Sequence, residues 1–221
     1  MITKAAVVPA LLVRGWSHES WVNAYFPSDL PSDWRFAYAA NDLRAMVVPA
    51  RDWHPLVEEE LSLSLQPSKS HLQAWLDDIP DGFDIYLELE DSSDAPQARS
   101  AQRMADFTAR LSQSFAGFMK RPHALNDTIA AGGATWALAS SVSSLADQHL
   151  QNEPPVAVWV GGTAFSTRPD LKALADFFRH LLNRPCEKRP DLIVITEPKV
   201  TPTVLSEVRI LLELVGESLL P

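Results

Sequence analysis

Polar side chains that could do chemistry follow several apolar runs of the chain, at the points where those runs end. His18 and His54 each follow such a run with a carboxylate nearby, and Glu88 and Glu90 share one face of a third run because strand side chains alternate. Two carboxylates on one face could act as acid and base or hold a divalent cation. The favoured alternative is a solvated strand end or a pairing with arginine.

The histidines do not form a recognised metal motif, because neither HxH nor HExxH occurs in the chain. A metal site with histidine ligands needs two or three of them in convergent geometry. Ser17 also lacks the GxSxG context of a hydrolase nucleophile. The sequence therefore predicts no metal and no cofactor. It identifies no catalytic residue, so it leaves open whether the protein is an enzyme.

A glycine turn offers another kind of chemistry. Gly161, Gly162 and Thr163 lie between an apolar run and a helical pattern. Two glycines let backbone N–H groups approach a phosphate, and a helix start favours negative charge. The spacing matches neither a P-loop nor a dinucleotide fingerprint. A tight turn that needs glycine is the favoured alternative.

Aromatic residues gather in the first quarter of the chain. Four of the seven tryptophans lie there: Trp16, Trp21, Trp34 and Trp53. Such a cluster could stack a flat ligand, although filling a small core is the favoured interpretation. The segment 15–27 is interpreted as a loop at the mouth of a strand. We expect Trp16 and Trp21 to lie near the C-terminal end of the first strand and to pack against Trp53 or its neighbours.

The elements that must position these residues are indicated by the hydrophobic pattern. Apolar runs predict strands over residues 7–13, 43–48, 83–89, 114–119, 135–139, 156–160 and 192–195. Helical spacing predicts helices over residues 96–111, 170–182 and 201–215. The last helix has Thr201 as its cap and Gly216 as its stop. Strands alternating with helices predict a parallel α/β sheet in one domain over residues 1–221.

The composition of the whole chain bears on its binding partners and its cellular compartment. The 221 residues carry a formal net charge of −9, which disfavours broad nucleic-acid binding. Cys186 is the single cysteine, which fits a reducing compartment. No apolar stretch reaches the length of a membrane span. The expectation is a cytoplasmic protein without a nucleic-acid or membrane partner.

Residues 15–49 show a characteristic spacing of aromatic residues and prolines. The spacing comprises Gly15-Trp16-Ser17, Trp21, Tyr25-Phe26-Pro27, Leu30-Pro31, the FAYAA of residues 36–40, and Met46-Val47-Val48-Pro49. This pattern resembles the YecE-like family (domain of unknown function 72). The resemblance implies a TIM-type parallel barrel of seven to eight strands, and the short chain makes an irregular or incomplete barrel the expectation.

Two departures bear on function, because Val47 and Pro49 stand where the family has a Glu and an Asn. One interpretation is a YecE-like barrel that binds a small polar or phosphorylated ligand at the C-terminal strand ends. The alternative is a non-catalytic interaction protein descended from that family, with self-association left open. The predicted ligand-binding residues are Trp16, His18, Trp21, Arg51, Glu88, Gly161, Gly162 and Thr163. Among them Arg51 is expected to grip the anion, because a guanidinium can hold two oxygens at once.

Overall fold

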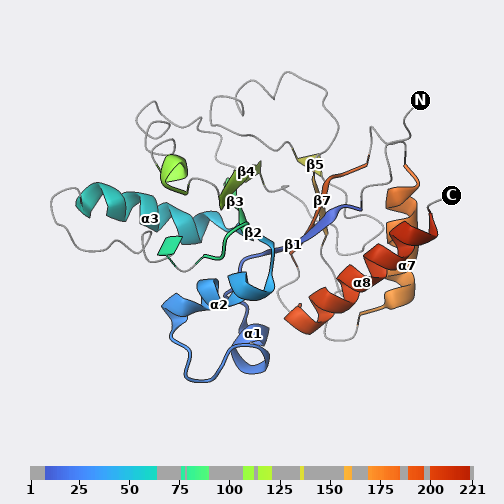
Figure 1. Cartoon of the computed structure of the whole chain (residues 1–221), viewed down its shortest axis with the longest axis horizontal. Coiled ribbons are helices and arrows are strands. Elements are labelled where there is room, and N and C mark those ends of the chain that lie inside the picture. The colour runs from blue at the N-terminus through green and yellow to red at the C-terminus, as the bar shows by residue number, and fades with distance from the viewer. Residues whose placement is uncertain are drawn as a thin grey trace, which may run out of the picture.

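The chain folds around one mixed sheet in its computed structural model (Figure 1). The structure describes residues 8–63, 76–77, 79–89, 107–111, 114–120, 135–136, 157–160, 169–184, 189–196 and 200–219. Strands from both ends of the chain belong to this sheet, so residues far apart in the sequence meet along it.

The seven strands lie where the apolar runs predict them. They are β1 (Ala10–Arg14), β2 (Ala45–Val48), β3 (Asp84–Leu89), β4 (Phe115–Lys120), β5 (Thr135–Trp136), β6 (Ala157–Val160) and β7 (Leu192–Ile195). β7 has the predicted bounds, while β5 is shorter than predicted. The runs of β2 and β7 are apolar throughout because both faces of the sheet are covered there.

The strand order is β4-β3-β2-β1-β7-β6-β5, so the first strand pairs with the last. Every pairing is parallel except the short one between β5 and β6. The two edge strands, β4 and β5, are consecutive in the sequence. No pairing among the described strands joins these edges, so a closed barrel is not seen and the sheet is open.

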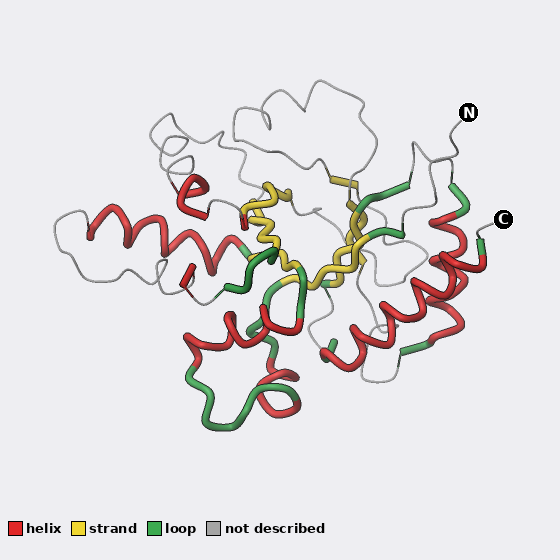
Figure 2. Tube along the Cα trace, viewed as in Figure 1, coloured by secondary structure: helices red, strands yellow, loops and turns green. Residues whose placement is uncertain are grey.

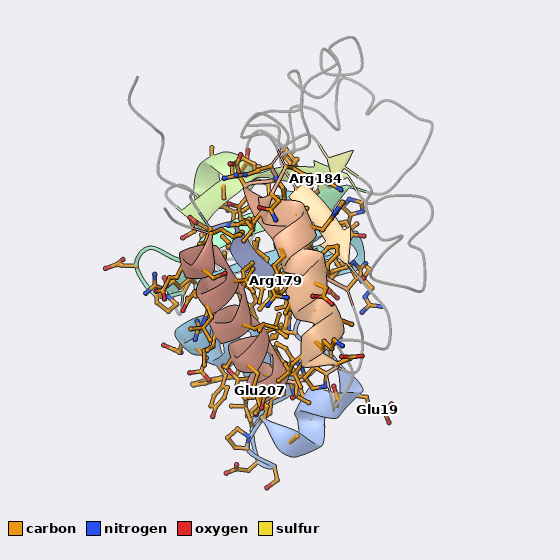
Figure 3. The ribbon with its side chains drawn as sticks, turned by 90° about the vertical axis from the view of Figure 1, so that its right-hand side faces the viewer. Glu19, Arg179, Arg184 and Glu207 are labelled. Carbon is orange, nitrogen blue, oxygen red and sulfur yellow. The ribbon has the colours of Figure 1, made fainter. Side chains whose placement is uncertain are left out.

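The described helices lie on the outer side of the curved sheet (Figure 2). They are α1 (Glu19–Ala24), α2 (Arg35–Asp42), α3 (Ala50–Leu63), α7 (Leu171–Leu182) and α8 (Pro202–Ser218), with a short 3-10 turn η1 (Ser32–Trp34) before α2. α7 and α8 pack side by side (Figures 1 and 3). The α8 N-cap is Thr201, whose side chain accepts a hydrogen bond from the Val204 N–H, as predicted.

Three expectations about helices need correction. The segment 15–27 is not a loop throughout, because α1 forms within it. A helix that the pattern does not predict, α3, begins directly after β2 and contains Pro55. Gly216 does not end α8, which continues to Ser218; a Cβ there would lie 2.6 Å from Val8 Cγ2, so glycine allows close packing. Of the predicted helix 96–111, only residues 107–111 are described, and they are helical.

Alternating side chains divide the sheet into two buried faces. The outer face packs with the five helices named above into the larger core, to which Val13, Met46 and Ile193 belong. The inner face forms a separate apolar layer. Its members are Leu12, Val47, Tyr86, Met119, Ala157, Leu192 and Val194. Arg14 and Glu88 follow Leu12 and Tyr86 by two residues, so they continue this inner face at the C-terminal edge of the strands.

Candidate functional site

An ion pair between a partly buried arginine and a buried glutamate crosses the inner face at the C-terminal ends of the strands. Arg14 Nε lies 2.5 Å from Glu88 Oε2, and Arg14 Nη2 lies 2.9 Å from Glu88 Oε1. The two residues belong to β1 and β3, and β2 lies between them in the sheet. The pairing therefore spans a strand, with Arg14 in register with Val47 and Val47 in register with Tyr86.

The Arg14–Glu88 pair is well removed from water. The side chain of Glu88 is 5% exposed and that of Arg14 is 19% exposed. Both carboxylate oxygens of Glu88 accept from the guanidinium, which is the strong two-bond geometry of this pairing. The favoured alternative, a Glu88 held by arginine, is thus what the structure contains. Glu90, its proposed partner in acid–base chemistry, lies outside the described residues.

Trp53 contacts the end of β3 from the outer core, on the face of the sheet opposite the Arg14–Glu88 pair. Its indole Nε1 donates to the backbone carbonyl of Glu88 over 2.9 Å, and its ring stacks on Phe107 with centroids 5.8 Å apart. Trp53 is 1% exposed and lies on α3. The helix that follows β2 is therefore tied to the strand that carries Glu88.

Gly15 forms a sharp turn directly after β1. This turn leads the following residues along the C-terminal edge of the strands. Its φ of +76° lies in the left-handed region, where a residue with a Cβ is strained. A Cβ at this position would also lie 3.2 Å from Pro49 Cγ. The Gly15 N–H donates to the Val47 carbonyl over 2.9 Å, which closes the turn onto β2.

His18 lies at the N-cap of α1, with its ring 5.3 Å from that of Trp21. Its Nε2 is buried and has no hydrogen-bond partner among the described residues. Burial lowers the pKa of His18 below 6.5, and the charges of Arg14 and Arg51 act in the same direction. Backbone hydrogen bonds with Arg14 and Gly15 oppose this shift. His18 is therefore neutral at pH 7.

We expect this neutral His18 to make stability depend on pH. Its folded-state pKa lies below the value of 6.5 for an unperturbed ring, so the unfolded chain takes up the proton more readily. The contribution of His18 is then complete above about pH 6.5 and is lost as the pH falls through the folded-state pKa. Urea unfolding of the wild type and His18→Phe at pH 7.5 and at lower pH values checks this. A free-energy difference between them that stays constant with pH would contradict it.

Arg51 and Asp52 lie in the first turn of α3, beside the Arg14–Glu88 pair. The Arg51 side chain is 68% exposed, and its Nε lies 3.7 Å from Asp52 Oδ1. Asp52 Oδ2 is buried and has no hydrogen-bond partner among the described residues. Burial raises the pKa of Asp52, and the nearby Glu88 adds to this rise, while Arg51 and Arg14 lower it.

Of the predicted ligand-binding residues, the structure brings three to one place. Arg14 pairs with Glu88 and interacts electrostatically with His18. Arg51 in turn interacts electrostatically with His18. Gly161, Gly162 and Thr163 lie outside the described residues.

The two predicted tryptophans belong to the outer core. Trp16 is 8% exposed and contacts Phe36, and Trp21 is fully buried. Trp21 contacts the rings of His18, Tyr25 and Phe26, whereas Trp53 contacts those of His54, Phe107 and Phe118. Trp16, Trp21 and Trp53 all belong to the same larger core. The packing of Trp16 and Trp21 against Trp53 or its neighbours stays a prediction. The burial of Trp16 and Trp21 agrees with the interpretation that these tryptophans fill the core.

Arg14 and Asp52 complete the site, although the predicted set does not include them. We refer to Arg14, His18, Arg51, Asp52 and Glu88 together as the strand-end cluster. The sequence contains a signal for Arg14 and Asp52, because each follows or ends an apolar run as the predicted site residues do. Only the pairing of the strands in the structure shows that these residues lie at the same edge of the sheet.

The chain has no match among protein-family models, curated proteins or solved structures. Within the described part of the chain, no three His, Cys, Asp or Glu side chains come together as ligands for a metal ion. None of the described helices is long and apolar enough to cross a membrane.

Proposed function

We propose that the protein binds a small phosphorylated or otherwise anionic molecule at the strand-end cluster, as a YecE-like α/β protein with an incompletely closed barrel. The observation that carries this proposal is the gathering of two arginines and a neutral histidine at the carboxyl ends of β1 and β2. Parallel strands point their carboxyl ends toward one edge, where both barrels and open parallel sheets hold their ligands.

The strand order supports the barrel part of the proposal. In a doubly wound sheet, the strand on the second side of β1 comes from the middle of the chain. Here the last strand, β7, lies beside β1, and the two edges are the consecutive strands β4 and β5. This is the cyclic order of a barrel opened between its fourth and fifth strands. The YecE-like resemblance of the opening segment implies the same architecture.

The charges of the cluster favour Arg51 as the residue that grips the anion. Glu88 already occupies two donors of Arg14, whereas Arg51 is largely exposed and lies 3.7 Å from Asp52 Oδ1, beyond hydrogen-bond distance. The first turn of α3 adds partial positive charge from its backbone N–H groups. No residue of the cluster is assigned a catalytic role, so the proposal is one of binding.

Arg51→Gln is expected to weaken the binding of inorganic phosphate about tenfold or more, because charge-assisted hydrogen bonds contribute about 1.5–3 kcal/mol. Calorimetric titration at constant ionic strength measures this. Arg179→Gln is the matched control, since Arg179 is a half-exposed arginine on α7 (Figure 3), a helix that carries no residue of the strand-end cluster. Equal phosphate affinity of Arg51→Gln and the control, or no phosphate binding by the wild type, would contradict the proposal.

A second function, self-association, is favoured by one observation on α8. Ile210 and Leu214 lie one turn apart on this helix and are 54% and 57% exposed. Apolar side chains in such a row are typical of a surface that packs against another helix. Sedimentation of the wild type against Ile210→Gln/Leu214→Gln over a range of concentrations tests this alternative.

A further inference from the structure

The helix α8 has apolar side chains on two of its sides. One side packs into the larger core and consists of Val204, Leu205, Val208, Leu212 and Val215. Ile210 and Leu214 lie on the outward side and are 54% and 57% exposed, and we call them the apolar row of α8. The core accounts for the first side only. An exposed apolar row with polar neighbours is typical of a surface that contacts another molecule.

The neighbouring helix α7 shows the ordinary pattern of a surface helix. It packs against α8, and both helices lie at the surface that faces the viewer in Figure 3. After Leu171, its exposed residues are charged, polar or small: Lys172, Ala173, Asp176, Arg179 and His180. Arg179 Nη1 pairs with Asp176 Oδ1 over 2.8 Å, so charges of both signs balance there. The apolar row is therefore specific to α8.

Exposed glutamates surround the apolar row. Glu207 and Glu213 lie three positions before and after Ile210, so they share its side of the helix. Glu217 lies seven positions after Ile210, which is two turns along the same side. Arg209 is the one basic residue of α8, and its position is rotated about 100° from Ile210. The last turn has no basic residue, and the helix dipole adds partial negative charge at this end.

These charges make a second copy of the chain a poor partner for the outward face of α8. If two α8 helices met antiparallel about the apolar row, Glu207 of one copy would face Glu217 of the other. In a parallel pair, each glutamate would face the same glutamate. Like charges that face each other oppose association. The charges therefore favour a different partner over the self-association that the apolar row alone indicates.

We infer that the outward face of α8 is a docking surface for a basic amphipathic helix of another protein. The partner would place apolar side chains on Ile210 and Leu214 and lysine or arginine side chains beside the three glutamates. Helices recognise each other in this way through apolar anchors at helical spacing, with charges at the rim that select the partner. This inference goes beyond anion binding and does not depend on it.

The probe is a synthetic peptide of leucine and lysine, with its leucines at helical spacing so that it forms a basic amphipathic helix. We expect the full chain to bind this peptide in a fluorescence anisotropy titration. A second peptide carries glutamate at every lysine position and is expected to show no measurable binding. Affinity for the first peptide should fall as salt is raised, because exposed charges are screened.

One variant removes the apolar row. Ile210→Gln/Leu214→Gln should weaken binding of the leucine–lysine peptide about tenfold or more, because buried apolar area is the main favourable contribution to such an interface. Leu171→Gln is the matched control, since it removes a half-exposed leucine from α7, and it should leave the affinity unchanged. All three positions are exposed, so the variants should fold, and circular dichroism confirms this.

A second variant removes the acidic residues. Glu207→Gln/Glu213→Gln/Glu217→Gln should weaken peptide binding about tenfold at low salt and less at high salt. The matched control removes the same charge from exposed residues outside α8 and should have a smaller effect; it is Glu19→Gln/Asp29→Asn/Asp33→Asn. The comparison separates the local charge of α8 from the net charge of the chain.

The outcomes decide between this inference and its alternatives. Equal affinity of the wild type and Ile210→Gln/Leu214→Gln, equal binding of the two peptides, or equal losses in the two charge variants would each overturn the inference. If sedimentation shows a wild-type dimer that Ile210→Gln/Leu214→Gln dissociates, a second copy occupies the face and the inference is wrong. Losses confined to the α8 variants support it. Phosphate binding should be unchanged in Ile210→Gln/Leu214→Gln, so a failure here leaves the proposed function standing.

Discussion

Glu88→Ala is expected to lower the free energy of unfolding by about 3–5 kcal/mol, because it leaves the guanidinium of Arg14 partly buried without its counter-charge. In the wild type, both carboxylate oxygens of Glu88 accept from Arg14 within hydrogen-bond distance. Glu88 is the only buried charged residue in the described part of the chain. A domain is stable by about 5–15 kcal/mol in total, so the loss is large. Urea unfolding monitored by tryptophan fluorescence measures it.

The matched control is the double variant Arg14→Met/Glu88→Leu. Replacing a buried ion pair by apolar residues of similar size is often neutral or stabilising, so the double variant should recover most of the lost stability. A double-mutant cycle that includes Arg14→Met then gives the coupling between the two residues. If Glu88→Ala costs no more than an exposed-site change, the pair has no structural role and its assignment to the inner face is wrong.

Trp21→Ala is the second change with a large expected effect, again about 3–5 kcal/mol, because it removes a fully buried indole and leaves a cavity. Trp21 contacts Tyr25 and Phe26 within the outer core. Its Nε1 donates to the Val200 carbonyl over 2.6 Å, which ties α1 to the segment that leads into α8. Thermal and urea unfolding measure the loss.

Two further variants separate packing from hydrogen bonding at this position. Trp21→Phe keeps an aromatic ring but loses the donor to Val200, so a smaller cost of about 1–3 kcal/mol is expected. Trp34→Ala changes a tryptophan that is 58% exposed, and its effect should stay within about 0.5 kcal/mol. Similar losses for Trp21→Ala and Trp34→Ala would show that the Trp21 indole does not hold the fold together.

The strands are predictable because their signal is local. Leu192–Ile195 and Ala157–Val160 are short apolar runs flanked by turn residues, and such runs predict covered strands. The helix α3 is not predicted, because Asp52, His54 and Pro55 break the apolar pattern at its start. Gly216 has the position of a helix stop in the sequence, and only the tertiary contact with Val8 shows why glycine stands there.

The site is predictable only in part, because strand register decides which polar residues meet. His18, Arg51 and Glu88 each follow or end a strand, so their common edge is expected from parallel pairing. The pairing of Arg14 with Glu88 joins residues 74 positions apart across a third strand. No local pattern encodes that contact. The lowered pKa of His18 also depends on its burial in the folded chain, and then on two arginines from different parts of the sequence.

The most direct test of anion binding at the strand-end cluster is an NMR titration of the His18 ring in phosphate and in chloride at equal ionic strength. A bound anion beside the ring favours the charged imidazolium, so phosphate should raise the pKa of His18 from its lowered value in the free protein. The difference between phosphate and chloride should vanish in Arg51→Gln. Superimposable titration curves of the wild type in the two salts would contradict the account.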